Sequence, residues 1–434
     1  MKYTRSILLC IFSILCNNYI FSASNLIPVD LGWSKNSVNT AIFRNSSLAT
    51  YQDYQFVAFY DKEKNVVLGK RKHGTEVWEI SITQYKGNAN DAHNVISITV
   101  DGNGYLHVSW DHHGHPLNYT RSVAPMSLEL RDKMKMTEVE EDNVTYPEFY
   151  KFSNGDLLFA YRSGSSGNGN LVLKKYDIKT GGWNDMNNNL ISGENKRNAY
   201  WQIYVDNQDN IHVSWVWRET YNVDTNHDLC YAVSRDSGDT WEKSNGEKYN
   251  LPITLGNAEY VWRIPQNSEL INQTSMAVDD NGVPYIATYW RDPDSGVPQY
   301  YILYKSGDVW MRNQVTGRIS GFSLSGAGTK KIPISRPRIL CFNEEGKANI
   351  YFLFRDEERG SKVSMATISD IDKNEWTFED LTSFTVNSWE PTFDMELWKK
   401  EKILNIFVQN TEQGDGESTV EIDPQMIYIL EYIK

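Results

Sequence analysis

Four histidines in two short stretches are the side chains of this sequence most suited to proton transfer. His93 lies in "NDAHN", and His112, His113 and His115 lie in "DHHGH". A neutral imidazole accepts or donates a proton near physiological pH. His113 and His115 together with Asp111 also resemble a set of zinc ligands, but that set is incomplete, so we favour proton transfer over metal binding.

A tyrosine and an arginine, sixteen residues apart, follow the histidines. Tyr146 lies in "TYPEF", and Arg162 in "AYRSG" precedes a stretch rich in glycine and serine, which lets the backbone come close to a ligand. For Tyr146 taken alone we favour a packing role. A guanidinium binds a carboxylate through two parallel hydrogen bonds, so Arg162 is a candidate for binding an acidic group. We expect Arg162 at a rim, where an arginine contributes little to stability.

Further arginines and aromatic residues are candidates for holding a ligand. Arginines recur at strand ends in Arg218, Arg291 and Arg355, whereas Arg338 enters a strand. For each of these arginines taken alone, a salt bridge at the end of a blade is as well supported as contact with a ligand. Most aromatic residues should pack between sheets, and one or two should stack on a sugar ring. As substrate-binding residues we predict Arg218, Arg291, Arg338, Tyr200 and Trp201.

The elements that must position these side chains belong to a repeated unit. Seven copies of a polar turn followed by apolar strands begin at Tyr51, Asp101, Ser153, Asp206, Asp279, Asn343 and Trp398. This spacing matches four-stranded propeller blades better than any helical repeat. We therefore predict an all-β fold, a seven-bladed β-propeller, that forms a single domain over residues 25–434. The segment "IPVDLGW" should close the ring by pairing with the final blade.

The repeat separates structural histidines from candidates for function. His107 in "YLHVSW" and His212 in "NIHVSW" occupy equivalent places, so we expect both to be structural and hydrogen-bonded between blades. His93 and His113 have no counterpart in other copies. His93 precedes one strand and His113 follows the next, which places both imidazoles at one mouth of the propeller.

The N-terminus has the layout of a secretory signal. Lys2 and Arg5 precede the apolar run "ILLCIFSIL" and a small-residue stretch, with cleavage expected after Ser24. The leucine before Cys16 argues against a lipid anchor. We expect a secreted or periplasmic monomer with residues 1–24 removed and no membrane insertion. Two cysteines would then remain, which excludes a scaffold built on disulfides.

The charge balance excludes some classes of partner. The formal net charge is −13, and removal of residues 1–24 takes away two positive charges and no negative one. Such a field repels nucleic acid and anionic membranes. An acidic ligand remains possible where arginines gather at one site.

Two features of the sequence resemble known families. "SRDSGDTW", which starts at Ser234, matches the Asp-box of sialidase-like propellers and BNR repeats. The set of His93, His113, Tyr146 and Arg162 resembles the active centre of the propeller polysaccharide lyases, namely the ulvan lyases and the L-rhamnose-α-1,4-D-glucuronate lyases, with a related branch of rhamnosidases. The resemblance implies a secreted lyase that cleaves a 4-linked uronic acid, such as glucuronate linked to rhamnose, in an acidic polysaccharide. Because arginine can replace a metal cation in neutralising a carboxylate, we expect no catalytic metal and no cofactor for catalysis. The resemblance allows a structural calcium in the central channel.

The chemistry of these residue types agrees with that resemblance. A cation that neutralises the carboxylate of a uronate acidifies its C5 proton, a base removes this proton, and an acid protonates the departing O4. Arg162 should bind the carboxylate. His93, His113 and Tyr146 should share the two proton transfers, and the sequence does not assign which of them is the base.

Two other functions remain open. A glycoside hydrolase, including the rhamnosidase-like type, normally needs two carboxylates, and Asp111, Glu148 and Asp292 are available without a spacing that singles out a pair. The first histidine of the chain is His73, so the first-blade histidine assigned to the rhamnosidase branch has no equivalent. A glycan-binding propeller without activity is the second alternative, and the complete set of four residues argues against it.

Overall fold

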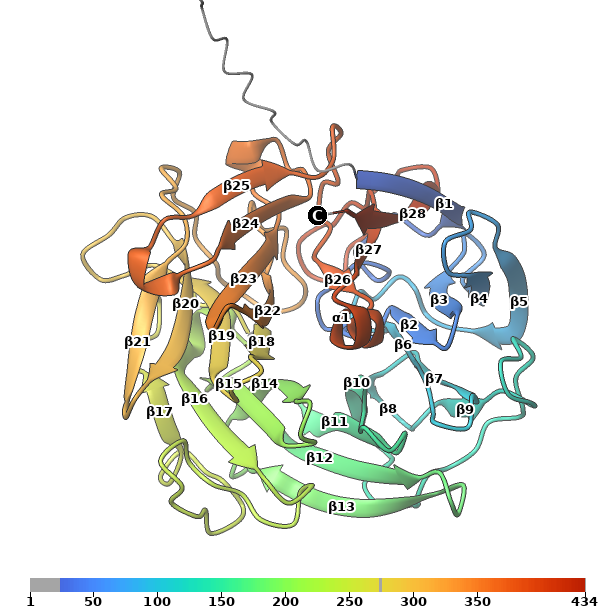
Figure 1. Cartoon of the computed structure of the whole chain (residues 1–434), viewed down its shortest axis with the longest axis horizontal. Coiled ribbons are helices and arrows are strands. Elements are labelled where there is room, and N and C mark those ends of the chain that lie inside the picture. The colour runs from blue at the N-terminus through green and yellow to red at the C-terminus, as the bar shows by residue number, and fades with distance from the viewer. Residues whose placement is uncertain (1–23, 273–274, 434) are drawn as a thin grey trace, which may run out of the picture.

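Seven antiparallel sheets surround a central axis in the computed structural model, which describes residues 24–272 and 275–433 (Figure 1). This arrangement confirms the predicted seven-bladed β-propeller. The predicted signal segment lies outside the described residues except for Ser24. None of the helices in the described ranges combines the length and the apolar character that a membrane span requires.

Four sheets have four strands each, in simple antiparallel order. They comprise β2 (Leu48–Tyr51), β3 (Tyr54–Tyr60), β4 (Asn65–Lys72) and β5 (Glu79–Lys86); β14 (Asn198–Val205), β15 (Ile211–Arg218), β16 (Asn226–Ser234) and β17 (Glu259–Trp262); β18 (Ser275–Val278), β19 (Pro284–Trp290), β20 (Gln299–Ser306) and β21 (Val309–Gln314); and β22 (Arg338–Glu344), β23 (Lys347–Phe354), β24 (Ser364–Ile368) and β25 (Thr377–Asp380).

The other three sheets depart from this order. The second blade consists of β6 (Ile96–Val100), β7 (Leu106–Trp110) and β9 (Tyr119–Arg121), and the third of β8 (His113–His115), β10 (Val144–Lys151), β11 (Leu157–Ser165), β12 (Asn168–Asp177) and β13 (Gly182–Ile191). The seventh consists of β26 (Thr392–Phe393), β27 (Leu404–Gln409), β28 (Gln425–Tyr432) and β1 (Ser24–Gly32). The helices are α1 (Met395–Glu401) and the short 3-10 helices η1 (Val223–Thr225), η2 (Glu357–Arg359) and η3 (Ile371–Lys373).

The first and last strands of the chain close the ring. β1 pairs antiparallel with β28, with Ile27 opposite Ile429 and Leu31 opposite Met426. The predicted closure by "IPVDLGW" is thereby confirmed, since this segment overlaps β1. The seventh blade is a complete four-stranded sheet only when both ends of the chain contribute to it.

Burial follows the position of a strand in its blade. Every residue of β6 and of β14 is buried, because inner strands are covered on both faces. In β5, an outer strand, exposed residues alternate with partly buried ones, as expected for a strand that packs on one face only. Cys230 and Cys341 are both free and buried.

The connections between strands define two faces of the propeller. Five of the seven predicted repeat starts fall between the innermost and the second strand of a blade, and the other two, Tyr51 and Asn343, lie in the last two residues of an innermost strand. In the seventh blade α1 occupies the place between these strands. Because the strands are antiparallel, the connections from the second to the third strand, and from one blade to the next, lie on the opposite face. We call this opposite face the cavity face.

β8 is an additional strand at the seam between two blades. It follows β7 of the second blade but pairs with β10 of the third, with His113 opposite Thr145. The Gly114 amide also donates to Thr145 Oγ1 at 2.8 Å. The repeat did not predict this pairing, which joins the histidine stretch to the neighbouring blade.

The repeat-equivalent histidines have the same surroundings in two blades. His107 Nδ1 lies 2.7 Å from the Tyr119 hydroxyl, and its Nε2 lies 3.1 Å from Asp101. His212 makes the same two contacts, at the same distances, with Tyr231 and Asp206. These hydrogen bonds lie within one blade, so the expectation that they join neighbouring blades was wrong.

We expect ring closure to depend on the buried side of β1. Ile27 is 1% exposed, and Ile27→Ala should lower the free energy of unfolding by about 2–5 kcal/mol, the usual cost of removing a buried isoleucine side chain. Leu31 is 49% exposed on the same strand, so Leu31→Ala is the matched control and should stay within about 0.5 kcal/mol. Thermal melting of the two variants measures the difference, and equal melting temperatures would contradict it.

Candidate active site

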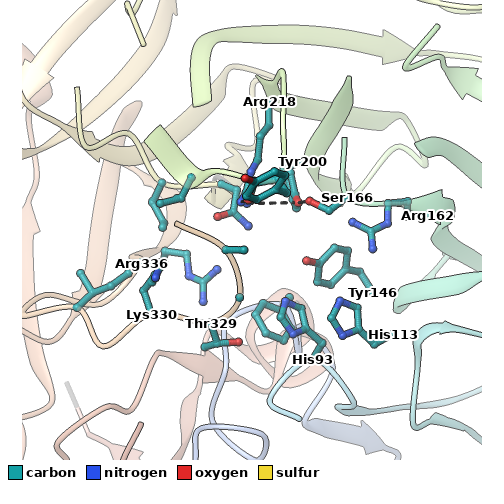
Figure 2. A pocket seen from close by; sticks show the side chains of 18 residues that line it. His93, His113, Tyr146, Arg162, Ser166, Tyr200, Arg218, Thr329, Lys330 and Arg336 are labelled. Carbon is teal, nitrogen blue, oxygen red and sulfur yellow. Dashed lines mark hydrogen bonds between the residues drawn. The ribbon is translucent and has the colours of Figure 1, made fainter. Parts of the chain in front are cut away.

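A cavity of about 230 Å³ opens on the cavity face, lined by residues of the third and fourth blades and of connections between blades (Figure 2). Its ionisable and hydroxyl-bearing lining residues are His93, His113, Tyr146, Arg162, Ser166, Tyr200, Arg218, Tyr221, Thr329, Lys330 and Arg336. The four predicted catalytic residues therefore meet at one place, together with two of the predicted substrate-binding residues. Among the residues that the structure describes, no Asp or Glu lines this cavity.

One carboxylate orients both histidines of the cavity. Asp91 Oδ1 lies 2.9 Å from His93 Nδ1, and its Oδ2 lies 2.6 Å from His113 Nδ1. The two imidazoles are stacked, with ring centroids 4.0 Å apart. Because an ionised carboxylate only accepts hydrogen bonds, each Nδ1 must carry a proton, and each Nε2 remains available for chemistry.

The two histidines differ in their second carboxylate. His93 Nδ1 also lies 3.1 Å from Glu417 Oε1, which comes from the connection between β27 and β28. Burial acts to lower the pKa of His93, but the hydrogen bonds to Asp91 and Glu417 raise it to about 9. For His113, burial outweighs the contact with Asp91, and its pKa is lowered. One imidazole is thus charged and the other neutral at neutral pH.

Tyr146 holds an unusual backbone conformation at the start of β10. Its φ is +57°, and the pairing of β10 with β11 is interrupted between Thr145 and Glu148. Such conformations are costly for a residue with a bulky side chain and often mark functional sites. Burial, together with the neighbouring Tyr200, raises the pKa of Tyr146 well above its usual value. Its hydroxyl therefore stays protonated and can donate.

Arg162 lies within β11, three residues before its end, and beneath the rim rather than on it. It is 1% exposed, which corrects the expected rim position. Its Nη2 donates to Thr145 Oγ1 at 3.1 Å, while Nε and Nη1 are buried without a hydrogen-bond partner in the described part of the chain. A buried guanidinium with two unused donors suits a carboxylate ligand.

The stretch after Arg162 forms the β11–β12 hairpin. A Cβ atom at Gly169 would lie 2.7 Å from Arg162 Cδ, so only glycine lets this backbone pass the arginine. Ser166 at the tip of the hairpin lines the cavity, and its hydroxyl lies 3.3 Å from the Tyr200 hydroxyl. The glycines therefore accommodate the arginine, and the serine reaches the ligand space.

Tyr200 and Arg218 form a second polar group at the cavity. Arg218 Nη1 lies 3.4 Å from the Tyr200 hydroxyl, and its Cζ lies 5.5 Å from the centre of the tyrosine ring. Burial acts to raise the pKa of Tyr200, but the charges of Arg218 and Arg162 lower it to about 7. Both residues were predicted as substrate-binding, and the structure places both at the cavity.

The remaining predicted residues lie elsewhere. Arg291 is paired with Glu269 at 2.5 Å, and Arg338 donates to the carbonyl oxygen of Ile42 at 2.9 Å. Trp201 is buried beside Tyr146, with ring centroids 6.4 Å apart. Arg291, Arg338 and Trp201 do not line the cavity.

Three residues that shape the site were not predicted from the sequence. Arg336, two positions before Arg338, lines the cavity, and its Nη2 is paired with Glu390 at 2.6 Å. Asp91 and Glu417 orient His93. The proximity of Asp91 to His93 in the sequence was an available signal, whereas Glu417 lies more than three hundred residues away.

Asp91, His93 and His113 also form a group that could hold a metal ion. Their ligand atoms lie within 4.8 Å of one another, and they are the one such group found over residues 24–272 and 275–433. Two imidazoles and one carboxylate suit zinc better than calcium, which prefers oxygen ligands. Both Nδ1 atoms already donate to Asp91, so metal binding would have to displace these hydrogen bonds.

Comparisons with known proteins agree with the fold. A family model described as "BNR repeat-containing family member" matches residues 54–318. The chain is 23% identical over 332 residues to the long isoform of ulvan lyase from Pseudoalteromonas sp. (strain PLSV), covering 59% of this chain and 33% of that protein. It therefore spans about a third of the length of this relative. It is 24% identical over 410 residues to an ulvan lyase from Alteromonas sp. (strain LOR), covering 84% and 81% of the two chains.

Solved structures give the same picture at lower identity. The crystal structure of polysaccharide lyase Uly1 has a TM-score of 0.70 at 14% identity, covering 95% of this chain and 100% of that chain. A PL25 ulvan lyase has a TM-score of 0.66 at 16% identity, covering 95% and 96%. At these identities the likeness shows a shared fold.

Because the pKa of His93 is raised, we expect the free energy of unfolding to depend on pH. A folded-state pKa of about 9, above the ordinary 6.5, contributes stability that is fully present below pH 6.5 and is lost as the pH rises towards 9. The stability advantage of the wild type over His93→Gln should therefore shrink by up to about 3 kcal/mol over this range. Melting temperatures at several pH values test this, with exposed His115→Gln as the control. An advantage that grows with pH would contradict the assigned charge.

Proposed function

Because this chain belongs to the BNR repeat-containing family, we propose that its cavity is the active site of a polysaccharide lyase that cleaves a 4-linked uronic acid by β-elimination. The single observation that carries the proposal is the buried Arg162, whose Nε and Nη1 have no partner among the described residues, beside a neutral imidazole and a protonated tyrosine. This combination matches the needs of β-elimination: a cation for the carboxylate, a base and an acid.

Arg162 would bind the uronate carboxylate through its unpartnered Nη1 together with the adjacent Nη2, the pair that can make two parallel hydrogen bonds. Bidentate binding spreads the negative charge that develops when the C5 proton leaves, and it is strongest in a site that excludes water. The imidazolium of His93 adds a second positive charge near the same group. These two cations replace the metal ion that could otherwise neutralise the carboxylate.

His113 is the base that the geometry favours. Its Nδ1 proton points to Asp91, so its Nε2 lone pair is free to take the C5 proton, and its lowered pKa keeps it neutral at neutral pH. As the proton moves to Nε2, the C5–H electrons form the C4=C5 double bond and the C4–O4 bond breaks. The proximity of Asp91 stabilises the imidazolium that results.

Tyr146 is the acid that the geometry favours. Its hydroxyl stays protonated, and donation of this proton to O4 completes the departure of the leaving group. The phenolate that forms would lie beside Arg162, whose Cζ is 5.0 Å from the ring centre. Tyr200, with a pKa lowered to about 7, is the alternative base if the substrate presents its C5 proton to that side of the cavity.

The glycoside hydrolase alternative receives less support. Asp111 accepts the Asn88 amide, Asp292 is paired with Arg312, and Glu148 is bonded to Tyr150. Hydrolysis normally requires two carboxylates that flank the scissile bond. None of these three residues lines the cavity.

The names of the relatives suggest the substrate. Several are ulvan lyases, and one related structure is described as bound to -[GlcA(1-4)Rha3S]-. We therefore propose that the linkage cleaved here joins glucuronate to rhamnose. We also propose that residues 1–24 direct export and that the mature protein acts as a monomer.

Incubation of the purified protein with ulvan, gum arabic and other uronate-rich glycans tests the function. The lyase should release a 4,5-unsaturated uronate, which absorbs ultraviolet light. A hydrolase would release reducing ends without this absorbance, and a binding protein would release neither. Either result across the whole panel would refute the proposal.

Two substitutions test the assigned roles. Arg162→Met should leave the melting temperature unchanged or higher, because it removes a buried charge with incomplete partners, yet lower turnover at least about 100-fold. His113→Ala should lose activity on the same scale. His107→Ala is the control, since it should mainly lower the melting temperature and keep turnover below that temperature. Near-full turnover of both site variants would remove these residues from the chemistry.

Metal removal tests the proposed role of the two cations. Because Arg162 and His93 supply the positive charge, EDTA treatment should leave turnover within about two-fold of its starting value. Elemental analysis of the treated protein checks that any bound metal has been removed. Complete loss of activity that zinc or calcium alone restores would show that a metal ion, at Asp91, His93 and His113 or elsewhere, takes part.

A further inference from the structure

A long connection on the cavity face crosses from one side of the ring towards the other. It joins β21 to β22, and its residues 326–331, here called the strap, contribute Ala327, Gly328, Thr329 and Lys330 to the cavity wall. Figure 2 shows Thr329 and Lys330 on the side of the cavity opposite Arg162 and His113. The strap therefore faces the groups proposed to carry out the chemistry.

The strap is fixed to the fourth blade at its first residue. The Gly326 amide donates to Asn222 Oδ1 at 2.6 Å, and the Gly326 carbonyl accepts from the Val223 amide at 2.9 Å. Asn222 and Val223 belong to the connection between β15 and β16, which also lies on the cavity face. The connection between β15 and β16 thus provides hydrogen-bond partners for both the amide and the carbonyl group of Gly326.

The strap is fixed to the seventh blade at its other end. The Thr329 amide donates to Glu417 Oε1 at 3.0 Å, and the Lys331 amide donates to Asp415 Oδ1 at 3.1 Å. Gly328 has a φ of +74°, and a Cβ atom there would lie 2.8 Å from Gly416 Cα. Glycine at both positions lets the two backbones touch, so the strap and the β27–β28 connection form one continuous wall.

The shape of the cavity follows from these two attachments. A polymer that passes through a binding site needs a groove with two open ends. Here strands of the third and fourth blades line one side of the space, and the strap forms the wall that faces Arg162. The volume of about 230 Å³ is below the roughly 300–1,000 Å³ of typical small-molecule sites. The space suits the end of a chain better than its interior.

We propose that the strap makes this site specific for the end of an acidic glycan chain, so that the protein removes terminal units rather than cutting at internal positions. The proposal rests on the proposed lyase function for its chemistry and on the strap for its cleavage pattern. Lys330 would lie beside the terminal unit, where its ammonium adds positive charge to the cavity.

Cleavage of ulvan by the full-length protein tests the pattern. If the protein removes terminal units, short unsaturated products should appear from the first minutes. The viscosity of the ulvan solution should fall little for each bond cleaved, because most of each chain stays intact. The double variant Asn222→Ala/Asp415→Ala removes one attachment at each end of the strap without changing a cavity-lining residue. Its viscosity loss per bond cleaved should rise at least about three-fold. Lys347→Ala, which removes an exposed ion pair with Asp370 elsewhere, is the control and should match the wild type.

Binding separates this proposal from the proposed chemistry. The inactive variant His113→Ala allows binding to be measured without cleavage. At a fixed mass of ulvan, cutting the polymer to half its length doubles the number of chain ends. The amount of this variant that the ulvan binds should therefore rise about two-fold. Affinity for uronate oligosaccharides should stop rising after the first few sugar units. A rapid viscosity loss by the wild type, or binding that follows polymer mass, would overturn the strap proposal. Absence of the ultraviolet-absorbing product with end-dependent binding intact would overturn the lyase function alone.

Discussion

The pairing of β1 with β28 is the contact on which the rest of the structure depends. A ring of sheets stays closed only if one blade takes strands from both ends of the chain, and here the seventh blade does so. The cavity takes residues from Phe43 to Arg336, and Glu417 reaches His93 from the last blade. The third blade carries His113, Tyr146 and Arg162, whereas His93 precedes the second blade and Glu417 comes from the seventh. Ring closure is therefore what brings Glu417 to His93, and loss of closure should separate these two residues.

The direction of the strands explains why the functional residues share a face. His93 precedes an innermost strand, and Arg162 lies near the end of a second strand, so both positions are towards the cavity face of an antiparallel blade. The additional strand β8 then fixes His113 against the next blade. Thr145 Oγ1 accepts hydrogen bonds from both Gly114 and Arg162, so one hydroxyl sets the distance between the histidine strand and the guanidinium.

The sequence predicts where along a blade strand a residue lies better than it predicts the direction in which its side chain points. The period of the repeat was sufficient for the number of blades and for the ring closure, and the breaks in the repeat pointed to His93 and His113. Arg291 occupies a strand end equivalent to that of Arg218, yet a nearby carboxylate, Glu269, holds it away from the cavity. Arg338 begins β22 and donates to the carbonyl oxygen of Ile42, whereas Arg336 lies in the connection before β22 and lines the cavity. Glu417 was beyond prediction, since only the closed ring brings it to His93.

Two stacked imidazoles that share one carboxylate cannot both carry a full positive charge without strong repulsion, because their ring centres are 4.0 Å apart. Asp91 contacts both rings and so does not decide which of them is charged. Glu417 contacts His93 alone, which favours protonation there and leaves His113 neutral. The same oxygen of Glu417 accepts the amide of Thr329 in the strap. The strap is thus joined to the carboxylate that favours protonation of His93 over His113, and displacement of the strap would alter the charge of the two histidines.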